Sequence, residues 1–348
     1  MLVPVESNEP SVRITAKPDQ IFIEKSTAGQ YLNSDFIVEN LTTETWRISH
    51  IEVSLFDVHA RLVLRKFVNE SGGIQTIPSR ELQGKASLLV FNPFFFFDHI
   101  VELDTLRFSF TFISGTENED ERQSKADVVI SPVYYETKTS LMLPVGERAI
   151  IWDGHDFYSH HRRLNYRHPM LQHFGFKTNF QRYGYDFVPV DQRGEMVHGD
   201  AESNEAWFGF GTSIDATADG RVVDLFDGMP DDRKFDEAEL ATREMVIFGN
   251  YVVIDHLNGE YSCFGHLKQG SIRVTLGEEV RQGQVIAQIG ASGSSLFPHL
   301  HYELRNGTGA KEVEGLPSYF HRFRRILGSK TIEVEYGQID TGDIVERQ

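Results

Sequence analysis

Short segments in which polar and apolar residues alternate occupy the first part of the chain. Such alternation is typical of strands that bury one face. Turn-forming residues separate these segments, and no period of a long helix lies among them. Several short strands within about 130 residues predict a β-sandwich of immunoglobulin-like shape. The clearest segments are residues 11–16, 20–24, 34–40, 50–57 and 105–112.

The stretch 151–182 breaks this pattern. It holds five of the 14 histidines, interleaved with arginines and aromatic residues, and shows little periodicity. Loops of this length inside a domain are usually functional when they are ordered. Strand-like segments then return at residues 185–190, 220–226, 250–256, 260–266 and 299–305. We therefore predict two mostly β domains, residues 1–145 and 146–348, with 151–182 as a long structured loop of the second.

Charge and composition exclude several classes of function. The formal net charge of −17 disfavours binding to nucleic acid, because an acidic surface repels phosphate. The densest apolar run, residues 88–97, is too short to span a bilayer. The first ten residues have neither a basic start nor a long apolar stretch, so we do not expect a signal peptide there. Cys263 is the single cysteine, which excludes an internal disulfide and predicts a buried thiol.

The pair His299 and His301 is the strongest candidate for chemistry. In a strand, residues two apart point to the same face, so these two imidazoles project side by side, with Glu303 further along. Pro298 suits the start of such a strand. Two neighbouring imidazoles can share a metal, or one can bind the metal while the other handles a proton. Two surface histidines on a strand are the alternative interpretation.

Several motifs around this pair occur in a known order. They are Gly-Asn-Tyr-Val-Val-Ile-Asp-His at 249–256, Phe-Gly-His-Leu at 264–267, the segment 276–290, and Pro-His-Leu-His-Tyr-Glu at 298–303. Together they resemble the lysostaphin-type (LytM-like) zinc endopeptidases over about residues 183–306. The resemblance implies an antiparallel β peptidase domain, one zinc ion, and cleavage of the peptide cross-links of peptidoglycan outside the cytoplasm.

The resemblance also implies roles for single residues. His301 matches a zinc ligand, and Asp186, in Tyr-Gly-Tyr-Asp, matches a second ligand. His299 and His266 match the catalytic histidines that assist the attacking water, while zinc keeps one coordination position open. The first ligand of the family lies four residues before Asp186, and that position is Arg182. A guanidinium stays protonated and cannot donate a lone pair to zinc.

Two explanations of Arg182 remain open. A histidine of the loop can replace the missing ligand, or Arg182 can pair with Asp186 and leave a site without zinc. The candidate replacement ligands are His160, His161 and His173.

The sequence thus supports two main hypotheses. The first is a zinc metallo-endopeptidase that acts on peptidoglycan or a similar small-residue peptide. The second is a catalytically degenerate LytM-like module that binds the cell wall or regulates another wall hydrolase as its partner. A third hypothesis gives the N-terminal sandwich the main role, as a dock for glycan or for a partner protein. An extracytoplasmic location follows from the resemblance, although no leader is expected in this chain.

Overall fold

The computed structural model describes residues 10–26, 28–69, 79–114 and 122–348. The segment on which the expectation about a leader rests lies mostly outside these residues. The chain divides into two compact units, Met1–Tyr135 and Glu136–Gln348. The sequence interpretation drew this boundary after residue 145. Residues just after Tyr135 already pack within the second unit, because the backbone N–H groups of Lys138 and Thr139 each donate to the Glu260 carboxylate at 2.9 Å.

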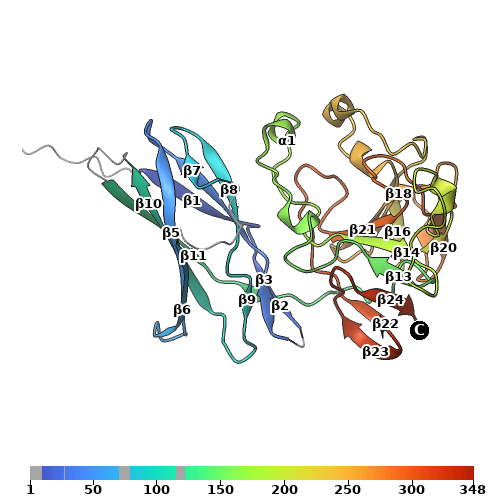
Figure 1. Ribbon diagram of the computed structural model, residues 1–348, viewed down its shortest axis with the longest axis horizontal. Helices are drawn as coiled ribbons and strands as arrows, with labels where there is room; N and C mark the ends of the chain where they lie inside the picture. Colours follow the sequence, from blue (N-terminus) through green and yellow to red (C-terminus); the bar gives the residue numbers. More distant parts are fainter. Residues whose placement is uncertain (1–9, 27, 70–78, 115–121) are drawn as a thin grey trace, which may run out of the picture. The chain divides into compact units, whose positions relative to one another are not determined.

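The first unit is built from short antiparallel strands (Figure 1). Within its described residues, they form sheets in the orders β1–β4–β8, β11–β10–β5–β6 with β7 on β5, and β12–β2–β3–β9, where only β12 and β2 run parallel. The bounds are β1 (Val12–Lys17), β2 (Phe22–Lys25), β3 (Gln30–Leu32), β4 (Asp35–Asn40), β5 (Trp46–Phe56), β6 (Leu62–Asn69), β7 (Glu81–Leu82), β8 (Ser87–Phe91), β9 (Phe96–Phe97), β10 (Thr105–Ser114), β11 (Arg122–Ile130) and β12 (Val133–Tyr134).

Aromatic side chains join two of these sheets. The Phe36 ring of β4 lies 4.6 Å from Phe108 and 5.4 Å from Phe110 of β10, measured between ring centroids. All three residues are fully buried in one apolar cluster. Each of the five segments expected as strands overlaps an observed strand. The prediction of an N-terminal β-sandwich is therefore confirmed.

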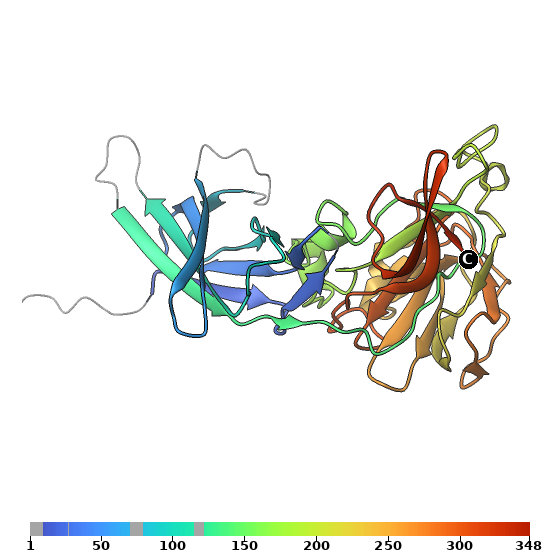
Figure 2. The same ribbon diagram turned by 90° about the horizontal axis from the view of Figure 1, so that it is seen from below.

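One large antiparallel sheet organises the second unit (Figure 2). Its order is β19–β16–β17–β18–β21–β14–β13–β24–β22–β23, and β15 pairs with β20 separately. The prediction of a mostly β second domain is confirmed. The bounds are β13 (Ala149–Ile151), β14 (Tyr185–Pro189), β15 (Ser213–Asp215), β16 (Gly220–Phe226), β17 (Asn250–Asp255), β18 (Tyr261–Leu267), β19 (Glu279–Val280), β20 (Val285–Gln288), β21 (Leu300–Arg305), β22 (Phe320–Leu327), β23 (Lys330–Gly337) and β24 (Ile344–Arg347).

The histidine-rich loop runs between β13 and β14. It contains the 3-10 helix η1 (His161–Arg163) and the short helix α1 (Pro169–His173). Pro169 suits the first helical position, because its missing N–H would have no partner there. The Asn179 side chain ties the loop together by donating to the carbonyls of His161 at 3.0 Å and Arg162 at 3.2 Å. Further 3-10 helices are η2 (Asn204–Ala206), η3 (Glu237–Ala241) and η4 (Val246–Phe248).

Two expectations from composition can be compared with the structure. Cys263 of β18 is completely buried, and burial raises the pKa of its thiol to about 12. None of the helices in the described residues has the length and apolar character needed to cross a bilayer.

Candidate metal centre and active site

Three neighbouring strands in the middle of the large sheet position the candidate residues. Asp186 of β14 pairs in register with His301 of β21, which pairs in turn with Gly265 of β18. Directly opposed residues point to the same face of a sheet, so the Asp186 and His301 side chains meet. His266 follows Gly265 in β18, and His299 directly precedes β21. The sheet register thus gathers four of the residues that the sequence singled out.

Three imidazoles converge on the Asp186 carboxylate. His301 Nδ1 lies 3.0 Å from Oδ1, His299 Nε2 lies 3.4 Å from Oδ1, and His161 Nε2 lies 3.6 Å from Oδ2. Asp186 is only 3% exposed. Burial would raise its pKa, but the positive charges that His161 and His299 can carry hold the pKa well below its ordinary value. Asp186 is therefore an ionised acceptor at neutral pH.

A buried chain of charges supports His301 from behind. Its Nε2 lies 2.6 Å from Glu303 Oε1, and Glu303 Oε2 lies 3.3 Å from Arg305. Burial alone would lower the pKa of His301, but its bonds to Asp186 and Glu303 raise that pKa to about 9. A carboxylate behind a metal-binding histidine fixes the tautomer, because it takes the N–H of the other ring nitrogen. Here Glu303 accepts from Nε2, so Nδ1 is the ring nitrogen that faces Asp186 and that would bind a metal.

His299 and His266 share another arrangement. His299 Nδ1 lies 2.7 Å from the Phe297 carbonyl, and His266 Nδ1 lies 2.8 Å from the Ser292 carbonyl. A carbonyl can only accept, so each Nδ1 carries a proton, and in the neutral form of each ring Nε2 keeps its lone pair. Burial, together with the charges on His299 and His301, lowers the pKa of His266 well below its ordinary value. His266 also has a φ of +57°, a strained backbone state that is enriched at functional sites.

The loop histidines lie in three different surroundings. His161 reaches Asp186 from η1, and its ring centroid is 4.6 Å from that of His301. His160 is exposed and contacts the carboxylate of Asp153. His173 ends α1 and is exposed, with its ring against Phe174. Of the three replacement ligands considered from sequence, His161 is the one that meets Asp186.

Arg182, which occupies the position of the family's first zinc ligand, forms an ion pair with Glu314. Its guanidinium is buried, and Nε lies 3.3 Å from the Glu314 carboxylate. This ion pair connects the turn before β14 to the segment after β21. The position that holds a ligand in the resembling family therefore takes part in a buried salt bridge in this chain.

The donor set fits a zinc ion. Bond lengths of about 2.0–2.1 Å in tetrahedral geometry place ligand atoms about 3.3 Å apart. The contacts of Asp186 lie on either side of this value: Oδ1 is 3.0 Å from His301 Nδ1, and Oδ2 is 3.6 Å from His161 Nε2. Two imidazoles and one carboxylate are also ligands of the kind found in catalytic zinc sites. The geometry therefore accommodates the metal that the sequence motifs imply.

A cavity of about 270 Å³ opens onto these residues. Its lining combines Asp186 and five histidines with apolar side chains, and Trp152 and Phe297 form an edge-to-face pair in its wall, with ring centroids 5.0 Å apart. Water is poorly held by apolar side chains, which strengthens electrostatic interactions inside the cavity. The histidines of the lining are His160, His161, His266, His299 and His301, and its other apolar residues include Leu164, Met170, Leu171, Phe180, Phe235 and Ile247.

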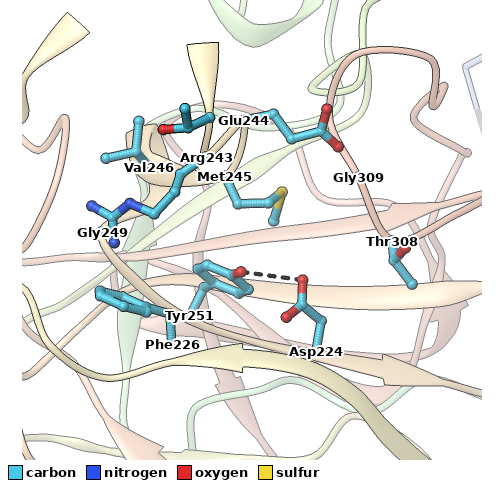
Figure 3. Close-up of a pocket in the computed structure, with 11 residues that line it drawn as sticks. Asp224, Phe226, Arg243, Glu244, Met245, Val246, Gly249, Tyr251, Thr308 and Gly309 are labelled. Atoms are coloured by element: carbon cyan, nitrogen blue, oxygen red, sulfur yellow. Dashed lines mark hydrogen bonds between the residues drawn. The ribbon is translucent and has the colours of Figure 1, made fainter. Parts of the chain in front are cut away.

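A second cavity of similar volume lacks comparable chemistry (Figure 3). The Tyr251 hydroxyl donates to the Asp224 carboxylate at 3.1 Å, and no histidine lines the cavity. Met245 and Thr308 in its wall contact the Arg305 side chain. The wall of this second cavity therefore contacts Arg305, which pairs with Glu303, and not the imidazoles themselves. For this reason we place the candidate active site at the cavity that the histidines line.

Sequence reasoning missed two parts of this arrangement. Asp153 was not considered, although it lies at the start of the loop that carries the histidine pair. The partnership of Glu303 and Arg305 was also missed. Glu303 shares the strand face of His301, so its spacing was the available signal, whereas the contact between Asp153 and His160 depends on the path of the loop.

Comparison with known proteins identifies the class. The model of peptidase family M23 matches residues 208–313, which include His266, His299 and His301 but not Asp186 or His161. Residues 208–313 of the second unit thus form a peptidase M23 domain, a module like those of cell-wall peptidases. The resemblance to LytM-like enzymes is thereby confirmed.

Particular relatives are of two kinds. The murein hydrolase activator EnvC of Escherichia coli is 33% identical over 131 residues, which are 35% of this chain and 26% of EnvC. The peptidoglycan DD-endopeptidase ShyC of Vibrio cholerae is 45% identical over 60 residues, 17% of this chain and 13% of ShyC. The alignments thus span about a quarter or less of these relatives. Among solved structures, a zinc-containing peptidase from Vibrio cholerae is 16% identical with a TM-score of 0.30, covering 85% of this chain and 83% of its own.

Proposed function

We propose that the second unit is a zinc metallo-endopeptidase that cleaves the peptide cross-links of peptidoglycan or a similar small-residue peptide. The observation that carries this proposal is the convergence of His161 Nε2, Asp186 and His301 Nδ1 beside two further imidazoles. In this proposal those three groups hold the zinc. The family match and the peptidoglycan endopeptidases among the relatives support the substrate class.

In this proposal the side chains around the zinc site have separate roles in the reaction. When bound, zinc supplies a Lewis acid that makes peptide hydrolysis possible near neutral pH. His299 and His266, whose Nδ1–H groups are fixed on carbonyls, offer Nε2 to accept a proton from the attacking water and to return it to the leaving amine. His266 suits the accepting role because its lowered pKa keeps it neutral. Glu303 holds His301 in the orientation that binds metal.

The direct test combines metal analysis with digestion of purified peptidoglycan. We expect one or more zinc ions per chain and the release of cleaved cross-links, detected by mass spectrometry. His301→Ala should lose the zinc ion bound by His301 and the cleavage activity, whereas the exposed His198→Ala serves as a matched control and should lose neither. Cleavage that persists in His301→Ala, or a zinc-loaded protein that releases no fragments, would contradict the proposal.

A regulatory module is the second candidate function. Two observations favour it: Arg182 occupies the position of the standard first ligand, and EnvC is named as an activator. A regulator would stimulate a partner hydrolase without cleaving the wall itself. If His299→Ala stimulates wall digestion by added hydrolases as well as the original chain does, while neither cleaves alone, the regulatory function is supported and the peptidase is not. Either function implies an extracytoplasmic place of action, which fractionation of cells can test.

A further inference from the structure

A second pair of potential ligands lies beside the centre described above. The Asp186 N–H donates to the Asp153 carbonyl, and the Trp152 N–H donates to the Asp186 carbonyl, both at 2.9 Å. This backbone pairing continues the β13–β14 ladder and brings the two carboxylates together. The side chains of Asp153 and Asp186 are 8% and 5% exposed. Two neighbouring buried carboxylates are unfavourable unless positive charge compensates them.

His160 completes this second group. Its backbone N–H donates to Asp153 Oδ1 at 2.8 Å, and its ring Nδ1 contacts Asp153 Oδ2. Asp153, His160, His161 and Asp186 each offer a ligand atom within 4.8 Å of the others. His161 faces Asp186 through Nε2, while its Nδ1 is buried without a hydrogen-bond partner in the described part of the chain. The group therefore contains two carboxylates and two imidazoles, and Asp153 and His160 are the members that have no role in the centre described above.

We propose that Asp153 and His160, with Asp186 as a shared carboxylate, hold a divalent cation of their own. This cation is distinct from the one assigned to His161, Asp186 and His301, and the inference rests on the proposed function only through Asp186. Nitrogen and carboxylate ligands suit zinc, and adjacent metal sites about 3.5–4 Å apart recur in hydrolases. His160 also lines the cavity, with a side chain that is 68% exposed. The cation would thus be accessible to a carboxylate or carbonyl oxygen of a ligand in the cavity.

Metal counting on the full chain tests this inference. The protein is stripped with a chelator, titrated with zinc and analysed by calorimetry and by elemental analysis after gel filtration. We expect two zinc ions per chain, with one lost in Asp153→Asn and one lost in His160→Ala. His301→Ala should also lose one but keep the ion at Asp153. His173→Ala, an exposed histidine of the same loop, is the matched control and should keep both.

The outcomes separate this inference from the proposed function. One zinc per chain that is lost in His301→Ala and unchanged in both Asp153→Asn and His160→Ala would overturn the second site and leave the peptidase proposal intact. Asp153 and His160 would then form an ordinary ion pair. Asp153→Asn retains Oδ1 as acceptor for the His160 N–H, and thermal melting checks that it folds. The exposed His160→Ala decides the matter if Asp153→Asn does not fold.

Discussion

Replacing His161 by alanine tests the most specific feature of the candidate centre. In the proposed centre this residue supplies the third donor from the loop, in place of the position that Arg182 occupies. Structural zinc sites with four ligands bind with about 10–16 kcal/mol, so one ligand contributes about 2.5–4 kcal/mol. We therefore expect His161→Ala to weaken the affinity of the zinc site at His301 by about 100- to 1,000-fold, since each 1.4 kcal/mol is about tenfold.

The assay is competition for zinc between the protein and a chromophoric chelator, at fixed pH because protons compete for His301. His173→Ala is the matched control, since it removes an exposed histidine from the same loop. Circular dichroism and thermal melting show whether each variant is folded. An affinity for zinc in folded His161→Ala that equals that of His173→Ala would refute the assignment of His161 as a ligand, and with it the explanation of how this chain tolerates Arg182.

Three further predictions follow from the same geometry and from one buried acid elsewhere. Glu303→Gln should lower zinc affinity about 10- to 100-fold in the competition assay, because it weakens the hydrogen bond that orients the His301 ring. An unchanged affinity would contradict the role of Glu303 in orienting His301. His299→Ala should lower kcat for peptide cleavage about 100- to 10,000-fold while elemental analysis finds the zinc content unchanged. Burial and the carboxylates of Asp156 and Asp343 raise the pKa of Asp340 to about 6 from 3.8, so the folded state binds more protons and stability falls as pH rises between these values. Asp340→Asn should raise the free energy of unfolding at pH 7 by about 1–2 kcal/mol and flatten this dependence in denaturant titrations, and an unchanged slope would count against it.

The sequence predicted the parts of the site that lie on strands. His301 and Asp186 belong to segments with clear strand patterns, and their proposed roles as ligands follow from motifs with fixed spacing. Period-2 alternation reports which face a side chain occupies, and it correctly placed His299 and His301 on a common face. The two-domain, mostly β architecture was predicted for the same reason. The exact end of the first unit was not, because the contacts of Lys138 and Thr139 with Glu260 are separated by more than a hundred residues.

Contacts made by the loop could not be derived from spacing. His160, His161 and His173 were equivalent candidates, because residues 151–182 have no regular period from which a direction could be inferred. What distinguishes them is the path of the loop: η1 turns His161 inward, while α1 leaves His173 exposed. Arg182 illustrates the same limit. The structure pairs Arg182 with Glu314, which lies far from it in the sequence. The sequence analysis had considered Asp186 as its partner, because Asp186 is only four residues away.

Supplying a ligand from the loop has a physical consequence for the site. In the arrangement implied by the motifs, the first ligand is fixed by the turn that leads directly into β14. In the proposed centre the corresponding donor is His161, whose position depends on η1 and on the hydrogen bonds from Asn179 to the loop backbone. A ligand that binds only the folded arrangement stabilises that arrangement, so metal binding and loop order must strengthen each other. The same loop lines the cavity through Leu164, Met170 and Leu171. The loop that would complete the proposed metal centre therefore also shapes the space in which a substrate would lie, and a change in one would affect the other.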